Sequence, residues 1–230
     1  MTMASEFDGG CVLFFVKSPL TGAVKTRLAS EIGEAHATAL YRCFVEDSAA
    51  TLKRCNVEQR FCFCPNDSRD DFVKWFGDGY RYEAQFGRNL GERMKNAFKR
   101  CFDEGFSKVV VVGSDIPDLP ECFLGDAFAV LGLCDAVIGP TQDGGYYLIG
   151  FSSKGFLPQA FDGIAWGGKT VYEQTVGILE FYEIETHVLP LWRDVDTVAD
   201  LRALVKRNKD TAFAQSVTMR YVRESKLWGG

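Results

Sequence analysis

The sequence has few histidines, no C-x-x-C pair and no long apolar run. His36 and His187 are its only histidines, and without a G-x-S-x-G motif they do not support a serine-hydrolase triad. No apolar run approaches the roughly 18–20 residues of a membrane span, so we expect no membrane association. The eight cysteines are interpreted as reduced core residues of a cytoplasmic protein.

A basic excess is also missing, because the formal charge of the 230-residue chain is −5. Proteins that bind nucleic acids usually carry a surplus of Lys and Arg, so we expect no nucleic-acid partner. The length suits a single α/β domain, which we assign to residues 11–207. Residues 1–10 lack the basic and apolar regions of a secretory signal and are expected to be a polar tail. We expect residues 208–230 to be a C-terminal helical extension.

Apolar runs alternate with amphipathic stretches along the chain. Cys11–Val16 and Lys108–Val112 are typical of buried strands, whereas Glu34–Arg54 and Asn89–Phe102 have the spacing of helices. This alternation predicts an α/β fold with a mostly parallel sheet and helices on both faces. A hairpin expected over residues 135–151 would make the sheet mixed. Ligands of such sheets bind beyond the carboxyl ends of the strands.

A cationic loop follows the first strand. It runs from Lys17 to Arg27, contains the turn-forming Pro19 and Gly22, and leads into a helix. Free N–H groups at a helix start attract phosphate, and cationic side chains add to the attraction. Lys25 and Arg27 are therefore candidate catalytic residues, and Pro19 and Gly22 are candidate binding residues. The alternative is a solvated loop whose cations pair with surface acids.

Carboxylates follow the central strand and the last one. Asp115 lies three residues beyond the last of four consecutive valines, and a carboxylate at the end of such a strand needs a cation. Mg²⁺ or Mn²⁺ would suit it, since both prefer oxygen ligands, although Asp115 and Ser114 capping a turn is the alternative. Asp194 and Asp196 precede the predicted capping box of Thr197 and are candidate further metal ligands. We predict that the carboxylates of Asp115 and Asp196 lie within about 6 Å and that their repulsion raises the pKa of at least one.

Glycines mark two further loops. Gly144 and Gly145, after Asp143, allow either a close approach of the backbone to a ligand or an ordinary hairpin turn. Trp166 precedes two glycines and belongs either to a lid over an acceptor or to a turn that leads into a helix.

Five segments, in this order, resemble a bacterial family of GT-A-like transferases. They are Pro19-x-x-Gly22-x-Val-Lys25-Thr-Arg27-Leu, Leu90-Gly-Glu-Arg-Met94, Gly113-Ser-Asp115-x-Pro117-x-Leu119, Gly139-Pro-x-x-Asp143-Gly-Gly-Tyr-Tyr and Asp194-Val-Asp196-Thr-x-x-Asp-Leu201. The chain is similar to the 2-phospholactate guanylyltransferases and, more distantly, to molybdenum cofactor guanylyltransferase. The resemblance covers roughly residues 11–204. It departs from the family where Pro19 and Gly22 replace a Gly-rich loop and where Asn89 replaces an acid.

The resemblance implies a three-layer α/β/α sandwich of the nucleotide-diphospho-sugar transferase type. It also implies that Lys25 and Arg27 face phosphates and that Asp115 and Asp196 hold the metal. Arg93, in the second segment, and Ser114, in the third, are then candidate contacts to the nucleotide.

The expected reaction is nucleotidyl transfer from a nucleoside triphosphate to a small-molecule phosphate acceptor. Glycosyl transfer from a nucleotide sugar is the alternative enzyme reading, although the aspartates Asp115 and Asp118 are one residue too far apart for a D-x-D motif. A non-catalytic nucleotide-binding module is the alternative from another class. Formation of a homo-oligomer is left open.

Overall fold

One mixed sheet forms the centre of the protein. Over residues 9–20, 24–225 and 227, which the computed structural model describes, seven strands pair in the order β3-β2-β1-β4-β6-β5-β7. They are β1 (Gly10–Lys17), β2 (Glu58–Cys64), β3 (Arg81–Ala84), β4 (Lys108–Gly113), β5 (Ala136–Pro140), β6 (Tyr146–Ser152) and β7 (Thr186–Val188). β6 is antiparallel to both of its neighbours, and the other pairings are parallel. The predicted mixed, mostly parallel sheet is confirmed.

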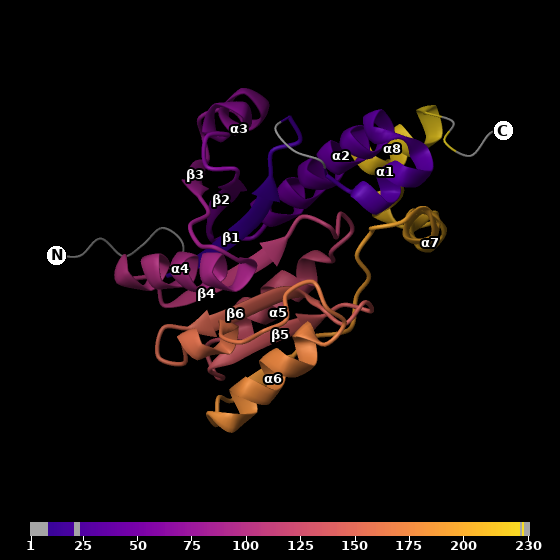
Figure 1. Ribbon diagram of the computed structural model, residues 1–230. Helices are drawn as coiled ribbons and strands as arrows, with labels where there is room; N and C mark the ends of the chain where they lie inside the picture. The colour runs from indigo at the N-terminus through magenta and orange to yellow at the C-terminus, as the bar shows by residue number, and fades with distance from the viewer. Residues whose placement is uncertain (1–8, 21–23, 226, 228–230) are drawn as a thin grey trace.

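Helices cover both faces of this sheet (Figure 1). They are α1 (Thr26–Ile32), α2 (Glu34–Lys53), α3 (Arg69–Phe76), α4 (Leu90–Asp103), α5 (Glu121–Val130), α6 (Val171–Phe181), α7 (Val198–Asn208) and α8 (Val217–Glu224). Apolar residues of α2, α3 and α5 share one core cluster with the sheet, and those of α4 and α6 share the other. The result is the predicted three-layer α/β/α sandwich.

The interior strand β1 has an apolar side chain at nearly every position, and its packing shows why. Val12, Phe14 and Val16 belong to the cluster under α2, whereas Cys11 and Leu13 belong to the cluster under α4. Successive strand residues point to opposite faces. A strand with helices on both faces therefore needs apolar side chains at every position.

The C-terminal segment packs against the rest of the fold. Val222 of α8 shares a core cluster with Leu28 of α1 and Leu40 of α2, and Figure 1 shows these helices gathered at one side of the molecule. The sequence predicted a helical extension over residues 208–230, and the structure divides its helical part in two. The extended backbone of Ser216 separates a short 3-10 turn, Ala212–Gln215, from α8, and the Ser216 side chain caps α8.

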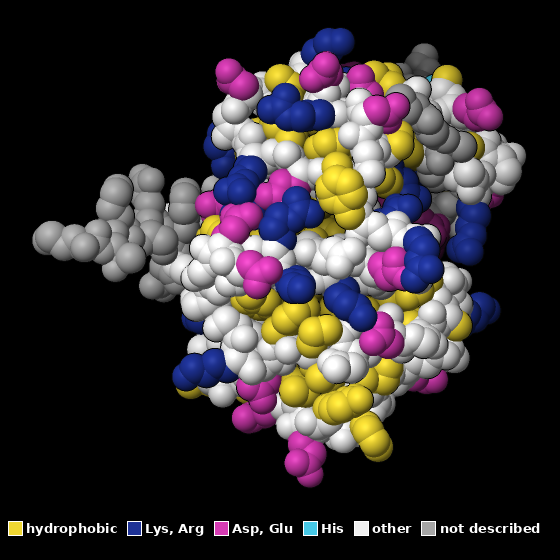
Figure 2. All heavy atoms as spheres, turned by 60° about the vertical axis from the view of Figure 1, so that its left-hand side comes forward, with side chains coloured by type: hydrophobic (Ala, Val, Ile, Leu, Met, Phe, Trp, Pro, Cys, Tyr) yellow, Lys and Arg dark blue, Asp and Glu magenta, His cyan; other side chains and the backbone are white. Residues whose placement is uncertain are grey.

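The surface carries charges of both signs. On the face drawn in Figure 2, Lys and Arg side chains are interspersed with Asp and Glu, and neither sign prevails. Within the described ranges, no helix combines the length and the apolar character that crossing a membrane requires.

Candidate functional site

Three distant segments meet at the carboxyl edge of the sheet. β1 and β4 are parallel neighbours, so the loops that follow them leave the sheet at the same edge. The segment before α7 is brought to this edge by a hydrogen bond from the backbone N–H of Val195 to the carbonyl oxygen of Asp115, at 2.9 Å. The loop after β1 thereby faces Asp115 and Asp196.

The ammonium group of Lys25 lies between two carboxylates. Its Nζ is 2.6 Å from Oδ1 of Asp115 and 2.8 Å from Oδ1 of Asp196. The separation of the two oxygens cannot exceed the sum of these distances, which is below the predicted 6 Å. The Lys25 side chain is only 3% exposed, whereas those of Asp115 and Asp196 are 52% and 33% exposed. The two aspartates therefore converge on a cation that the chain itself supplies.

The charge of Lys25 dominates the electrostatics of Asp196. Burial alone would raise the pKa of Asp196, but the nearby and hydrogen-bonded ammonium of Lys25 outweighs it and lowers that pKa. The pKa of Asp196 is thus lowered and not raised. Burial on its own would lower the pKa of Lys25, yet the two carboxylates raise it, so the ammonium stays charged.

The backbone at Lys25 has an uncommon conformation. Its φ of 52° and ψ of 48° lie in the left-handed region, which few residues other than glycine adopt. The residue directly precedes α1, and its carbonyl oxygen accepts a hydrogen bond from the N–H of Ala29 at 2.7 Å. This turn aims the side chain back into the fold.

A cavity of about 490 Å³ opens beside the three residues. Its lining includes Arg27, Arg93 and Ser114, all sequence candidates. Arg27 is 70% exposed and its Nη1 is 3.6 Å from Oδ2 of Asp196, while Nε of Arg93 donates to the carbonyl oxygen of Gly87 at 3.3 Å. With Lys17 and Lys25, two arginines and two lysines thus line one cavity at the sheet edge.

Two polar residues of the lining were missed by sequence reasoning. The hydroxyl of Tyr41, in the middle of α2, accepts from the N–H of Lys17 at 2.8 Å and lies 3.1 Å from Oγ of Ser114. Nε2 of Gln85 donates to the carbonyl oxygen of Cys62 at 2.6 Å. Gln85 directly follows β3, so inspection of strand ends would have found it. Tyr41 gives no comparable signal.

Other sequence candidates lie outside this lining. Pro19 borders a smaller neighbouring cavity, and Gly22 lies outside the described residues. Asp194 is also absent from the lining, but burial and the charges of Asp143 and Asp196 raise its pKa to about 6.

The loop of Asp143 has the contacts of a hairpin turn. Oδ1 of Asp143 accepts from Oγ1 of Thr141 at 2.5 Å and from the N–H of Gly145 at 3.0 Å. Gly144 has a φ of 91°, and a Cβ there would lie 1.8 Å from the carbonyl oxygen of Lys169. Close packing against the loop before α6 therefore accounts for the glycine.

The loop before α6 contains a motif that sequence reasoning overlooked. Its residues 163–170, GIAWGGKT, match the spacing G-x-x-x-x-G-K-T of a phosphate-binding P-loop. A P-loop follows a strand, whereas this segment follows a 3-10 turn, Pro158–Phe161. Trp166 packs against Gly91, where a Cβ would lie 2.6 Å from the indole ring, and it is not part of the cavity lining. The segment therefore has the residue spacing of a P-loop without its structural context.

The oxygen donors of the site suit a divalent cation that takes some of its ligands from the protein and the others from a bound substrate. Among the described residues, no group of three or more His, Cys, Asp or Glu side chains could hold a metal ion. Asp115 and Asp196 offer hard oxygen donors and already converge on a cationic group. Mg²⁺ typically uses one or two carboxylates and takes its other ligands from phosphate and water, which matches a pair of this kind.

The fold and the converging charges define a class, the nucleotide-diphospho-sugar transferase-like α/β proteins. The chain belongs to the family described as "Uncharacterized protein conserved in bacteria (DUF2064)", whose profile matches residues 48–168. The crystal structure of a candidate nucleotide-diphospho-sugar transferase from Desulfovibrio desulfuricans G20 superposes with a TM-score of 0.92 at 44% identity, over 95% of each chain. The family resemblance seen in the sequence is confirmed.

More distant solved structures share the fold alone. CMP:2-keto-3-deoxy-manno-octonic acid synthetase complexed with CTP matches at 10% identity and a TM-score of 0.53, over 86% of this chain and 98% of that chain. Rv0371c from Mycobacterium tuberculosis H37Rv, in complex with manganese, matches at 15% identity and a TM-score of 0.52, over 86% and 97%. A search among curated proteins found no match.

Proposed function

We propose that this protein transfers a nucleotidyl group from a nucleoside triphosphate to the phosphate of a small-molecule acceptor. An acceptor oxygen attacks the α-phosphorus, a new P–O bond forms, and the bond to the leaving pyrophosphate breaks. The supporting observation is the meeting of Lys25, Asp115 and Asp196 beside a cavity that Arg27 and Arg93 also line.

The reaction suits a site without a nucleophilic side chain. Phosphoryl chemistry of this kind depends on positioning and on charge neutralisation more than on covalent catalysis. Arg27 is largely exposed, and its guanidinium can hold two phosphate oxygens at once. Arg93, on α4, faces the same cavity and would orient the phosphate chain. Lys25 would neutralise charge that develops on the departing pyrophosphate.

Asp115 and Asp196 are the residues that would hold Mg²⁺ or Mn²⁺. When bound, such an ion neutralises phosphate oxygens and favours their in-line arrangement. Two distant relatives of the same fold, one in complex with manganese and one complexed with CTP, are compatible with this assignment. The backbone bond from Val195 to Asp115 holds the two carboxylate-bearing segments together.

Glycosyl transfer from a nucleotide sugar is the second candidate. The 44% identity to a candidate nucleotide-diphospho-sugar transferase favours it. Against it, Asp118 is not available as a second ligand beside Asp115. Its Oδ2 accepts from Nε of Arg207 at 2.7 Å and from Nδ2 of Asn208 at 2.6 Å, which anchors the end of α7. A non-catalytic nucleotide-binding module is the remaining alternative.

A thermal-shift screen tests the proposal. Nucleoside triphosphates and nucleotide sugars are added to the full chain with and without Mn²⁺. A ligand at 100 times its Kd should stabilise the folded state by about 2.7 kcal/mol, and Asp115→Asn should remove the part of the shift that needs Mn²⁺. Release of pyrophosphate in the presence of acceptors supports nucleotidyl transfer, and release of a nucleoside diphosphate supports glycosyl transfer. Binding without turnover across the panel would support a non-catalytic nucleotide-binding module. If no ligand binds, nucleotidyl transfer, glycosyl transfer and the binding module are all refuted.

A further inference from the structure

The position of Lys25 has a consequence for how the site takes up a metal. A divalent cation held by both Asp115 and Asp196 would lie about 2.0–2.6 Å from their oxygens. Nζ of Lys25 is already 2.6 Å and 2.8 Å from those same atoms. The ammonium and the metal therefore compete for one place.

Charge reinforces this competition. The two carboxylates carry two negative charges, of which Lys25 neutralises one, and the guanidinium of Arg27 lies 3.6 Å from the outer oxygen of Asp196. A divalent cation that enters while Lys25 stays would face two cationic groups at short range in a partly buried place. Like charges at this range repel strongly when solvent is scarce. Entry of the metal and departure of Lys25 are thus a single exchange.

We propose that Lys25 is an internal counter-ion that closes the Asp115–Asp196 pair to divalent cations until the phosphates of a nucleotide draw its ammonium away. This inference rests on the proposed function, because the phosphates supply the new partner of the lysine. The cavity already brings Arg27 and Arg93 beside Lys25, so phosphates held there are within the field of the ammonium. Metal and nucleotide then each strengthen the binding of the other.

The local backbone is consistent with a side chain that changes partners. Lys25 holds a left-handed conformation at the start of α1, which costs a residue with a side chain more than the right-handed one. The pairing with both carboxylates offsets that cost in the empty protein. Once a metal replaces the ammonium, the carboxylates no longer require this conformation.

The alternative is a permanent structural role. Lys25 would then stay between the carboxylates in every state, and its removal would leave two partly exposed acids without their shared cation and a weaker site. The two roles predict opposite effects of a neutral side chain on metal affinity in the absence of nucleotide.

Binding of Mn²⁺ to the nucleotide-free full chain separates the two roles. Free Mn²⁺ is measured by its electron paramagnetic resonance signal for the wild type, Lys25→Met and Lys25→Gln. Glutamine keeps a hydrogen-bond donor but no charge. The matched control is Arg27→Met, which removes an exposed cation from the same carboxylate. We expect both Lys25 variants to bind Mn²⁺ more tightly than the wild type by a factor of about 5–150, the range of typical coupling between sites, and the control to change far less.

A second measurement compares the affinity for a nucleoside triphosphate with and without Mn²⁺. In the wild type, Mn²⁺ should strengthen binding of a nucleoside triphosphate, after correction for their direct complex. In Lys25→Met that enhancement should shrink, while affinity for the triphosphate without metal falls. Tighter metal binding combined with weaker nucleotide binding is a pair of opposite changes that loss of structure does not produce.

The proposal is overturned if both Lys25 variants bind Mn²⁺ no more tightly than the wild type. It is equally overturned if both Lys25 variants are unfolded even with Mn²⁺ present. The fold would then require the ammonium between the two carboxylates, and the lysine could not leave them. If the wild type binds no triphosphate with or without Mn²⁺, the proposed function fails instead, and the nucleotide-free Mn²⁺ comparison still decides whether Lys25 excludes the metal.

Discussion

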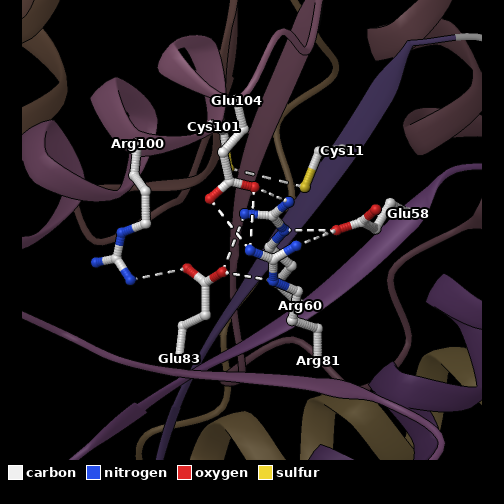
Figure 3. Close-up of polar contacts among 8 residues, drawn as sticks. All are labelled: Cys11, Glu58, Arg60, Arg81, Glu83, Arg100, Cys101 and Glu104. Atoms are coloured by element: carbon white, nitrogen blue, oxygen red, sulfur yellow. Dashed lines mark hydrogen bonds and ion pairs between the residues drawn. The ribbon is translucent and has the colours of Figure 1, made fainter. Parts of the chain in front are cut away.

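Arg60 offers a sharp test of how this fold tolerates buried charge. Its side chain has no exposed surface and contacts three carboxylates: Nε is 2.7 Å from Glu58, Nη1 is 2.9 Å from Glu83 and Nη2 is 2.6 Å from Glu104 (Figure 3). Glu58 opens β2 and Glu104 follows α4, so this cluster lies at the amino edge of the sheet, opposite the candidate site. Arg60→Met should therefore lower stability without touching that site.

The expected loss follows from the partners that remain. Removal of one member of a buried charge network typically costs about 3–5 kcal/mol, because the other charges are left buried and unpaired. Arg81 and Arg100 still contact Glu83, at 3.0 Å and 3.1 Å, which places the loss near the lower end, at about 3 kcal/mol. For a chain of this size, that corresponds to a fall in Tm of roughly 6–12 °C.

Urea and thermal unfolding of matched variants provide the assay. Arg54→Met is the control, since Arg54 also makes a 2.6 Å ion pair with a glutamate, but both side chains are about half exposed. An exposed pair contributes about 0–1 kcal/mol. Equal losses in Arg60→Met and Arg54→Met, or no loss in either, would refute the claim that burial sets the energy of these contacts.

Three further outcomes are expected. The hydrogen bond from Arg60 lowers the pKa of Glu104, so this carboxylate stabilises the folded state above its unfolded-state pKa and ceases to do so as the pH falls through its folded pKa. In pH-dependent urea unfolding, the stability difference between the wild type and Glu104→Gln should be largest at neutral pH, shrink as the pH falls below the unfolded-state pKa of about 4.3, and vanish only below the folded pKa. Thr197 caps α7 in a capping box, so Thr197→Ala should cost about 0.5–2 kcal/mol in urea unfolding, and a wild-type midpoint would show that the cap contributes nothing. Arg27→Ala should weaken binding of a nucleoside triphosphate by about 1.5–3 kcal/mol in calorimetry. The control Arg88→Ala removes an exposed arginine that pairs with Glu92 and should leave the affinity unchanged; equal affinities in all three proteins would make Arg27 a surface cation.

The order of the elements and the architecture of the sheet were already present in the sequence. The valines of Lys108–Val112 form β4 at the centre of the sheet, because a strand with helices on both faces must be apolar throughout. The capping box of Thr197 has the predicted contacts, since both of its partners lie within one turn. These features depend on residues that are near one another in the chain, so local patterns suffice to predict them.

The partners of individual charges were decided by the tertiary structure alone. Lys25 was predicted from the sequence to face phosphates, but its ammonium pairs with Asp196, 171 residues further along the chain, and with Asp115. Asp118 anchors the end of α7 through Arg207, which lies 89 residues further along the chain. A local pattern records which side chains follow a strand. It does not record which of them meet, because that depends on the crossover connections and on a single left-handed backbone turn that directs Lys25 inward.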